Sequence, residues 1–387
     1  MAFEFLAERL QERRQQGLLR APVEVQTYQQ QYILVAGRSY INFSSNDYLG
    51  LAQHPQLLAK ASNNGADVIA GSGGSPLVTG HSSSHQALID YICEQTQREA
   101  GLLCNSGFAA NFSILQSLLL SKKDIALMDK LSHASMIDGA LASEGRIQRF
   151  RHNDVAHLTA KLEAQTADNC LVVTEGVFSM DGDKAPLTSI APVCASHNAW
   201  LMVDDAHAIG VTGKQGFGHA DSDGLSQAEL PVWMATFGKG VGTSGAIICG
   251  SKTLIQYLNN FARHYIYSTA MSPLQAQLTL HSLQLMTQET WRREKLQGLI
   301  AQFQEGASRF GFNVLPSSTA IQPVIIGEPN EALLASEKLQ QKGIWVSAIR
   351  SPTVPVGSDR LRVTLTANHD AKDVDYLLRC LQEVLQA

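Results

Sequence analysis

The chain has 387 residues and a mass of 42.0 kDa, which predicts two domains, or one large α/β domain with a smaller companion. Hydrophobic residues make up 44% and charged residues 17%, a balance that excludes a disordered protein. The formal net charge of −5 disfavours a nucleic-acid binder, and the longest apolar runs are far too short to span a bilayer. We therefore expect neither nucleic acid nor a membrane as a partner.

The N-terminal region predicts a helix over residues 3–19, followed by a β-rich arm with strands near 33–35 and 40–43. Its first twenty residues are charged and lack the apolar core of a signal peptide. None of the six cysteines lies in a CxxC pair or at metal-ligand spacing. We expect a cytoplasmic protein with reduced cysteines and no bound metal.

From residue 44 to 284, short apolar strands alternate with amphipathic helices. The runs at 170–174 and 200–203 are nearly continuous in apolar residues and end in polar ones. Strands of this kind are typical of parallel sheets covered on both faces, where ligands collect at the carboxyl ends. This region predicts a large α/β domain with a mostly parallel central sheet flanked by helices.

The pattern changes after residue 284, where we expect a smaller α+β domain over 285–387 and, before both domains, an N-terminal helix and arm over 1–43. The predicted helices and strands of this last region are at 291–309, 321–326, 331–342, 343–348, 360–365 and 371–385.

Two glycine-rich stretches resemble nucleotide-binding loops but fail at defining positions. The run at 71–76 has Pro76 where a GxGxxG fingerprint needs glycine. Gly238 sits at the end of a Walker-like stretch in which Trp233 occupies the place of the first glycine. The acidic pair at 181–183 predicts a turn rather than a calcium loop. A nucleotide-dependent ligase is therefore a remote interpretation.

An aspartate, a histidine and a lysine follow predicted buried strands. Asp204 and His207 come at the end of the strand at 200–203, and Lys239 lies between glycines after the apolar run at 232–235. Such an aspartate is often only a helix cap, and a lone lysine is usually a solvated surface group. Together they suit pyridoxal 5′-phosphate (PLP), whose aldehyde binds a lysine and whose ring nitrogen needs a carboxylate.

Two further segments add weight to this interpretation. An apolar strand end at 102–103 turns through Ser106 and Gly107 into a helix, and the backbone N–H groups of such a helix start bind phosphate. His133 lies in a small polar loop, where it could stack on a flat cofactor, although a lone histidine is more often structural.

The chain resembles the α-oxoamine synthases, a family of PLP enzymes with the aspartate-aminotransferase-like fold (fold type I). The resemblance covers nearly the whole chain, in the order expected of the family. It rests on SSNDYLGL at 44–51, GSGGSPLVTGHSSSH at 71–85, NSGFAAN at 105–111, LSHASMIDGA at 131–140, TEGVFSMDGD at 174–183, VDDAHAIG at 203–210, TFGKGVG at 236–242, ARHYIYSTAMSP at 262–273 and RSPTVPVGSDRLRVTLTA at 350–367.

The resemblance implies a role for each residue of the cofactor site. Lys239 would form the Schiff base with PLP and act as general base, and Asp204 would pair with the ring nitrogen. His207, with Ser179 nearby, would bond the phenolic oxygen, and His133 would stack on the ring. The phosphate would be held by Gly107, Phe108 and Thr236, and by Ser268 and Thr269 of the neighbouring subunit, because the family is homodimeric with interfacial active sites.

The motif TFGKG and the C-terminal PTVPVG…RLRVTLTA point to the member of the family that works in biotin biosynthesis. The resemblance implies condensation of L-alanine with pimeloyl-CoA or a pimeloyl carrier protein, giving 8-amino-7-oxononanoate, free thiol and CO2. It also implies five residues for substrate binding: Arg362 on the amino-acid carboxylate, Asn46 as a second donor, and Arg20, His133 and Thr353. For Arg20 a surface arginine that ends the first helix is a serious alternative.

Two other functions stay open on the sequence. The first is a glycine-using sister that makes 2-amino-3-oxobutyrate or 5-aminolevulinate. The second is an interaction protein that keeps the fold without catalysis, although intact Lys239, Asp204 and His207 argue against it. The residues Ala208-Ile209 and those at 76–78 also differ from the residue types usual in the family's motifs, and both stretches are close to the expected site.

Overall fold

The computed structural model describes residues 2–63, 69–218 and 222–386. The chain forms two compact units, residues 1–45 with 298–387 and residues 46–297. The N-terminal arm therefore groups with the C-terminal strands, whereas the three-part division predicted at 43/44 and 284/285 stays a prediction. In the part of the chain that is described, no helix is both long and apolar enough to cross a membrane.

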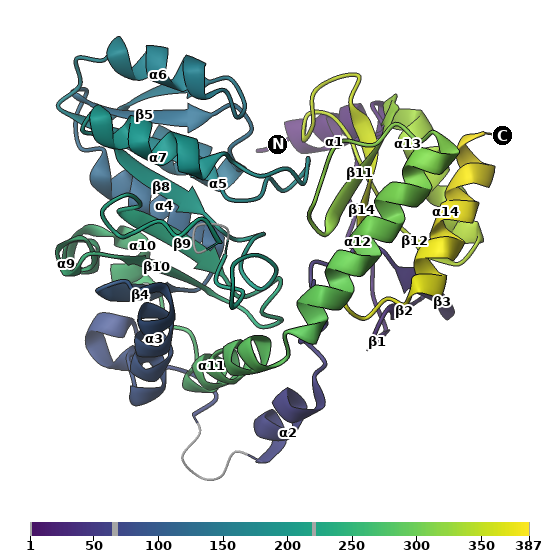
Figure 1. The fold of residues 1–387 in the computed structure, drawn as a ribbon, viewed down its shortest axis with the longest axis horizontal. Coiled ribbons are helices and arrows are strands. Elements are labelled where there is room, and N and C mark those ends of the chain that lie inside the picture. The colour runs from purple at the N-terminus through teal and green to yellow at the C-terminus, as the bar shows by residue number, and fades with distance from the viewer. Residues whose placement is uncertain (1, 64–68, 219–221, 387) are drawn as a thin grey trace. The chain divides into compact units, whose positions relative to one another are not determined.

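The larger unit is built on a seven-stranded sheet with the order β4-β10-β9-β8-β7-β5-β6 (Figure 1). Strand β10 runs antiparallel to both its neighbours, and all other pairs are parallel. The predicted, mostly parallel α/β sheet is confirmed. The strands are β4 (Ala100–Cys104), β5 (Asp124–Asp129), β6 (Arg146–Phe150), β7 (Asn169–Glu175), β8 (Trp200–Asp204), β9 (Val232–Thr236) and β10 (Ala246–Gly250).

Helices lie between most strands that are consecutive in the chain, as parallel pairing requires, and a loop joins β9 to the antiparallel β10. Those of the larger unit are α2 (Pro55–Asn63), the π-helical turn η1 (Pro76–Gly80), α3 (Ser83–Thr96), α4 (Gly107–Leu118), α5 (Ala134–Leu141), α6 (Val155–Glu163), α7 (Leu187–Ser196), α9 (Lys252–Phe261), α10 (Arg263–Tyr267) and α11 (Pro273–Gln288). Several start on a polar residue that accepts a backbone N–H of the first turn, such as Ser106 before α4 and Asp154 before α6.

The core of the larger unit lies between this sheet and the helices. Strands β5, β9 and β10 are buried along their whole length. Helix α4 buries Ile114 and Leu115 in a cluster that also contains Met128 and Met234 of the sheet. The strands that carry the candidate site are thus fixed by apolar packing behind them.

The smaller unit contains two sheets. Strands β1 (Thr27–Gln29), β2 (Tyr32–Val35) and β3 (Arg38–Asn42) of the arm pair with β12 (Ile344–Trp345), and β11 (Ile321–Gly327), β14 (Asp359–Thr364) and β13 (Ser347–Ile349) form the second sheet. The helices are α1 (Phe5–Gln15), α13 (Pro329–Gln341), α14 (Ala371–Leu385) and the later part of α12 (Trp291–Phe310). Helix α1 is shorter than the predicted 3–19, and Gly17, with φ +66°, follows its end.

Candidate active site

Lys239 lies on a tight turn that follows the buried strand β9. Its Nζ is 2.7 Å from Nε2 of His207, which follows the neighbouring strand β8. Glycine is required next to the lysine, because a Cβ on Gly240 would lie 2.4 Å from the carbonyl oxygen of Ile209. The turn therefore brings the amine and the imidazole together at the carboxyl end of the sheet, as the sequence predicted.

Asp204 ends strand β8 and is only 6% exposed. One carboxylate oxygen accepts the side-chain N–H of Asn111 at 2.7 Å, and the other accepts the backbone N–H of Ala206 at 2.8 Å. These two donors fix the carboxylate at the edge of the pocket that also contains Lys239. A buried carboxylate held in this way can face a protonated nitrogen of a ligand.

His133 is the N-cap of α5, and its Nδ1 accepts the backbone N–H of Ser135 at 3.2 Å. The Ser135 hydroxyl lies 2.8 Å from the same Nδ1 and accepts a bond from Asn111, which also holds Asp204. Burial lowers the pKa of His133, Lys239 lowers it further, and Asp204 acts against both. The ring is therefore neutral near pH 7, with Nδ1 as acceptor and its hydrogen on Nε2.

Glu175 ends strand β7 in register with Asp204 on strand β8. It is 2% exposed, and one of its carboxyl oxygens has no hydrogen-bond partner among the described residues. Burial and the charge of Asp204 raise the pKa of Glu175 well above its usual range, against the opposing charge of Lys239. Both causes favour the neutral carboxyl group of Glu175 over its carboxylate, so Asp204 is the favoured anion of this pair.

The start of helix α4 is the part of the site best suited to an anion. Ser106 caps the helix, and the first backbone N–H groups, at Gly107 and Phe108, have no partner within a helix. A Cβ on Gly107 would lie 2.5 Å from Cγ2 of Thr236, so only glycine fits. The buried hydroxyl of Thr236 has no partner among the described residues. Such an arrangement suits a phosphate group.

These groups line one open pocket of about 370 Å³, within the range of small-molecule sites. Its lining includes most of the predicted cofactor residues, namely Gly107, Phe108, His133, Asp204, His207, Thr236 and Lys239. The pocket therefore offers an amine, an anion, a neutral imidazole and a phosphate cradle together.

Comparison with known proteins agrees with this geometry. The family model of class I and II aminotransferases matches residues 38–381. The 8-amino-7-oxononanoate synthase of Cellvibrio japonicus is 47% identical over 382 residues, which cover 99% of this chain and 96% of that protein. The chain belongs to the family of 8-amino-7-oxononanoate synthases.

Solved structures place this synthase family among PLP enzymes. A serine palmitoyltransferase from S. paucimobilis with PLP bound matches with a TM-score of 0.92 and 25% identity, covering 99% of this chain and 97% of that one. An 8-amino-7-oxononanoate synthase from Francisella tularensis matches with a TM-score of 0.79 and 27% identity, covering 90% and 98%. The chain is a PLP-dependent acyltransferase of fold type I, as its sequence predicted.

The residues present fit PLP. The Thr236 hydroxyl, which has no partner in the described part of the chain, and the helix start match its phosphate. Asp204 matches its ring nitrogen, and the Lys239 amine matches its aldehyde. The neutral His133 ring lines the same pocket and can cover a flat group without adding charge.

Three predicted cofactor residues lie outside the pocket lining. The backbone N–H of Ser179 bonds the carboxyl of Glu175, beside the site. Ser268 and Thr269 line a separate pocket with His81 and His264, and the carbonyl of Thr269 accepts the side-chain N–H of Asn105. Asn105 lines both pockets.

The predicted substrate residues fall into both units of the synthase. Asn46 belongs to the larger unit, where its side-chain oxygen accepts the hydroxyl of Tyr48 at 3.3 Å. In the smaller unit, Arg20 donates to the hydroxyl of Thr353 at 3.3 Å, so these two predicted residues do meet. Arg362 is buried on strand β14 and donates to Thr364 at 3.1 Å.

Sequence reasoning missed three residues of the site: Tyr48, Asn111 and Glu175. Tyr48 bonds His207, Asn111 bonds Asp204, and Glu175 sits beside Asp204 in the sheet. The only signal was their place within the motifs at 44–51, 105–111 and 174–183.

Proposed function

We propose that the enzyme condenses L-alanine with a pimeloyl thioester, carried by CoA or by a carrier protein. The new carbon–carbon bond replaces the thioester bond, the thiol leaves, and the alanine carboxyl group is lost as CO2, which leaves 8-amino-7-oxononanoate. The observation that carries this proposal is the near full-length identity of 47% to a protein named for that product. The intact amine, carboxylate and imidazole of the pocket support it.

Lys239 is the proposed base for the α-proton of alanine. Its Nζ is hydrogen-bonded to His207, which directs the amine into the pocket. Lys239 would also hold PLP covalently between turnovers. PLP, when bound, supplies the electron sink that stabilises a carbanion at the α-carbon.

Asp204 is the proposed partner of the ring nitrogen. Asn111 and the Ala206 N–H hold its carboxylate in place, so the negative charge is preorganised for a protonated nitrogen. Burial and the charge of Asp204 disfavour a second negative charge on Glu175. His133 covers the ring face, and His207, with Ser179 close to Glu175, is the proposed partner of the phenolic oxygen.

The phosphate is assigned to the N–H groups of Gly107 and Phe108 and to the Thr236 hydroxyl. Phosphate contacts from Ser268 and Thr269 of a second subunit are proposed from the family resemblance, together with the homodimer itself. The proposal thus explains why these two residues line a different pocket from Lys239 in a single chain.

The roles in substrate binding rest on resemblance and residue type. A guanidinium can hold a carboxylate through two parallel bonds, and we assign Arg362 to the alanine carboxylate on that ground, with Asn46 as a second donor. Arg20 and Thr353, which are bonded to each other, are assigned to the acyl substrate.

Isotope labelling tests the reaction. With [1-¹³C]alanine and pimeloyl-CoA, we expect the label in CO2, and with [3-¹³C]alanine we expect it in the amino-ketone product, measured by mass spectrometry. Retention of the carboxyl label in the product contradicts decarboxylative condensation. Turnover only with glycine and a short acyl-CoA contradicts the choice of substrates and assigns the enzyme to the glycine-using sisters.

A further inference from the structure

A chain of hydrogen bonds leads from Lys239 through His207 to Tyr48, a side chain that the proposed reaction has not used. Nζ of Lys239 lies 2.7 Å from Nε2 of His207. On the other side of the ring, Nδ1 lies 2.6 Å from the hydroxyl of Tyr48. That hydroxyl donates to the side-chain oxygen of Asn46 at 3.3 Å. All four residues belong to the larger unit.

The direction of this chain follows from its far end. The side-chain oxygen of Asn46 can only accept, so the hydroxyl hydrogen of Tyr48 points to it. The Tyr48 oxygen is then left as an acceptor toward His207, and Nδ1 must carry the hydrogen of that bond. In a neutral imidazole Nε2 is then unprotonated, and its lone pair accepts an N–H of Lys239.

Tyr48 is well placed to impose this state because it is held rigidly. Its side chain is completely buried. The segment that carries it is a tight turn: the Asp47 carboxylate accepts the backbone N–H groups of Leu51 and Ala52 at 3.0 and 3.2 Å, and the Asp47 carbonyl accepts that of Gly50. Because the Tyr48 ring is held in this way, its hydroxyl keeps its position even when the imidazole of His207 rotates.

We propose that Tyr48 is a positioning residue that holds neutral His207 with its hydrogen on Nδ1 and thereby presents the Nε2 lone pair to Lys239. Asn46 orients the Tyr48 hydroxyl and has this second role beside any contact with substrate. The proposal deepens the proposed function and rests on it for its catalytic meaning. The hydrogen-bond state itself belongs to the protein without cofactor and can be measured there.

The test uses full-length apoenzyme with ¹⁵N-labelled histidine. Nitrogen chemical shifts report which ring nitrogen carries hydrogen, and His207→Gln identifies the signal. In the wild type we expect the Nδ1–H form of His207 to dominate. In Tyr48→Phe, which keeps the ring but removes the acceptor, we expect the ratio of Nδ1–H to Nε2–H to fall about fivefold, the factor equivalent to about 1 kcal/mol for a neutral hydrogen bond.

Two further variants sharpen the result. Asn46→Ala frees the Tyr48 hydroxyl to donate to Nδ1, so we expect a shift of His207 toward the Nε2–H form, as in Tyr48→Phe. Tyr257→Phe is the matched control, because its hydroxyl bonds the carbonyl of Ser117, and it should leave the His207 signals unchanged. Dominant Nε2–H in the wild type, or an unchanged ratio in Tyr48→Phe, overturns the proposal.

Failure of the proposed function would look different. If the wild-type apoenzyme shows the expected tautomer but the loaded enzyme releases no thiol with alanine and pimeloyl-CoA, the role of Tyr48 stands and the substrates are wrong. If thiol release is as proposed but the tautomer is not, only the role of Tyr48 is wrong.

Discussion

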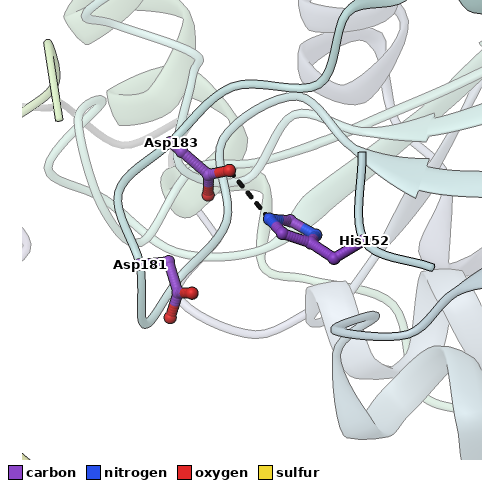
Figure 2. Close-up of side chains that lie close together, drawn as sticks. All are labelled: His152, Asp181 and Asp183. Atoms are coloured by element: carbon purple, nitrogen blue, oxygen red, sulfur yellow. Dashed lines mark hydrogen bonds and ion pairs between the residues drawn. The ribbon is translucent and has the colours of Figure 1, made fainter. Parts of the chain in front are cut away.

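His152 lies between two carboxylates in the larger unit, away from the residues that line the PLP pocket. Its Nδ1 is 2.9 Å from the completely buried Asp129 and its Nε2 is 2.8 Å from Asp183. Figure 2 shows the bond to Asp183 and the neighbouring Asp181. Burial alone would lower the pKa of His152, but the hydrogen bonds and charges of Asp129 and Asp183 outweigh it and raise the pKa to about 10.

The size of this effect can be worked out from that pKa. A rise from 6.5 to about 10 corresponds to about 5 kcal/mol of stabilisation of the imidazolium in the folded protein. Asp129 also accepts the backbone N–H groups of Leu131 and Asn153, which remain when the ring is removed. We therefore expect His152→Gln to reduce the free energy of unfolding by about 3 kcal/mol at pH 6, at the lower end of the range for broken buried ion pairs.

The loss should depend on pH in a defined direction. The pKa of His152 is raised by folding, so its stabilisation is complete below pH 6.5 and disappears as the pH rises toward 10. Above pH 7 the difference in unfolding free energy between wild type and His152→Gln should shrink by about 1.4 kcal/mol per pH unit, so that about 3 kcal/mol is lost by about pH 9.

Urea unfolding of the PLP-loaded protein at pH 6 and pH 9 measures this difference. Arg151→Gln is the matched control, because its ion pair with Asp154 is exposed and should contribute less than about 1 kcal/mol at either pH. An equal loss at both pH values for His152→Gln would show that the ring is neutral and would refute the reasoning. A protonated ring also lacks a lone pair for a metal, so Zn²⁺ should not raise the stability of the wild type.

Three further predictions concern the PLP pocket. Lys239→Ala should lower turnover at least about a thousandfold while the fold, measured by circular dichroism, is unchanged; substantial activity would contradict its role as the base and the covalent anchor. Gly107→Ala should raise the Kd of PLP about tenfold or more, because the added methyl would lie 2.5 Å from Cγ2 of Thr236, whereas Gly298→Ala, with nothing within 4 Å of its added Cβ, should leave it unchanged. Glu175→Gln should keep kcat within about threefold, because burial and Asp204 raise the pKa of Glu175 and so favour its neutral form, and a hundredfold fall would contradict this.

The meeting of Lys239, Asp204 and His207 could be predicted from sequence because of one geometric rule. Each follows an apolar strand, and β8 and β9 are parallel neighbours whose carboxyl ends share one edge. The start of helix α4 at Gly107 lines the same pocket. Sequence analysis predicted a phosphate-binding helix start there, because an apolar strand end turns through Ser106 and Gly107 into a helix.

The supporting contacts could not be predicted in the same way. Tyr48 bonds His207 across a long stretch of chain, and no periodicity relates the two residues. Glu175 looks like an ordinary strand-end acid until its register with Asp204 shows that both are buried together. The pairing of β3 with β12 is equally hidden, because hydrophobic patterns show that strands exist but not which ones are neighbours. The homodimer and the cytoplasmic location stay predictions.

The most direct test of the central claim is thiol release by purified, PLP-loaded enzyme. L-Alanine, glycine and L-serine are each paired with pimeloyl-, acetyl- and succinyl-CoA, with Lys239→Ala as the blank. The account predicts release with alanine and pimeloyl-CoA and none with Lys239→Ala. Release only with glycine and acetyl- or succinyl-CoA would contradict the proposed substrates.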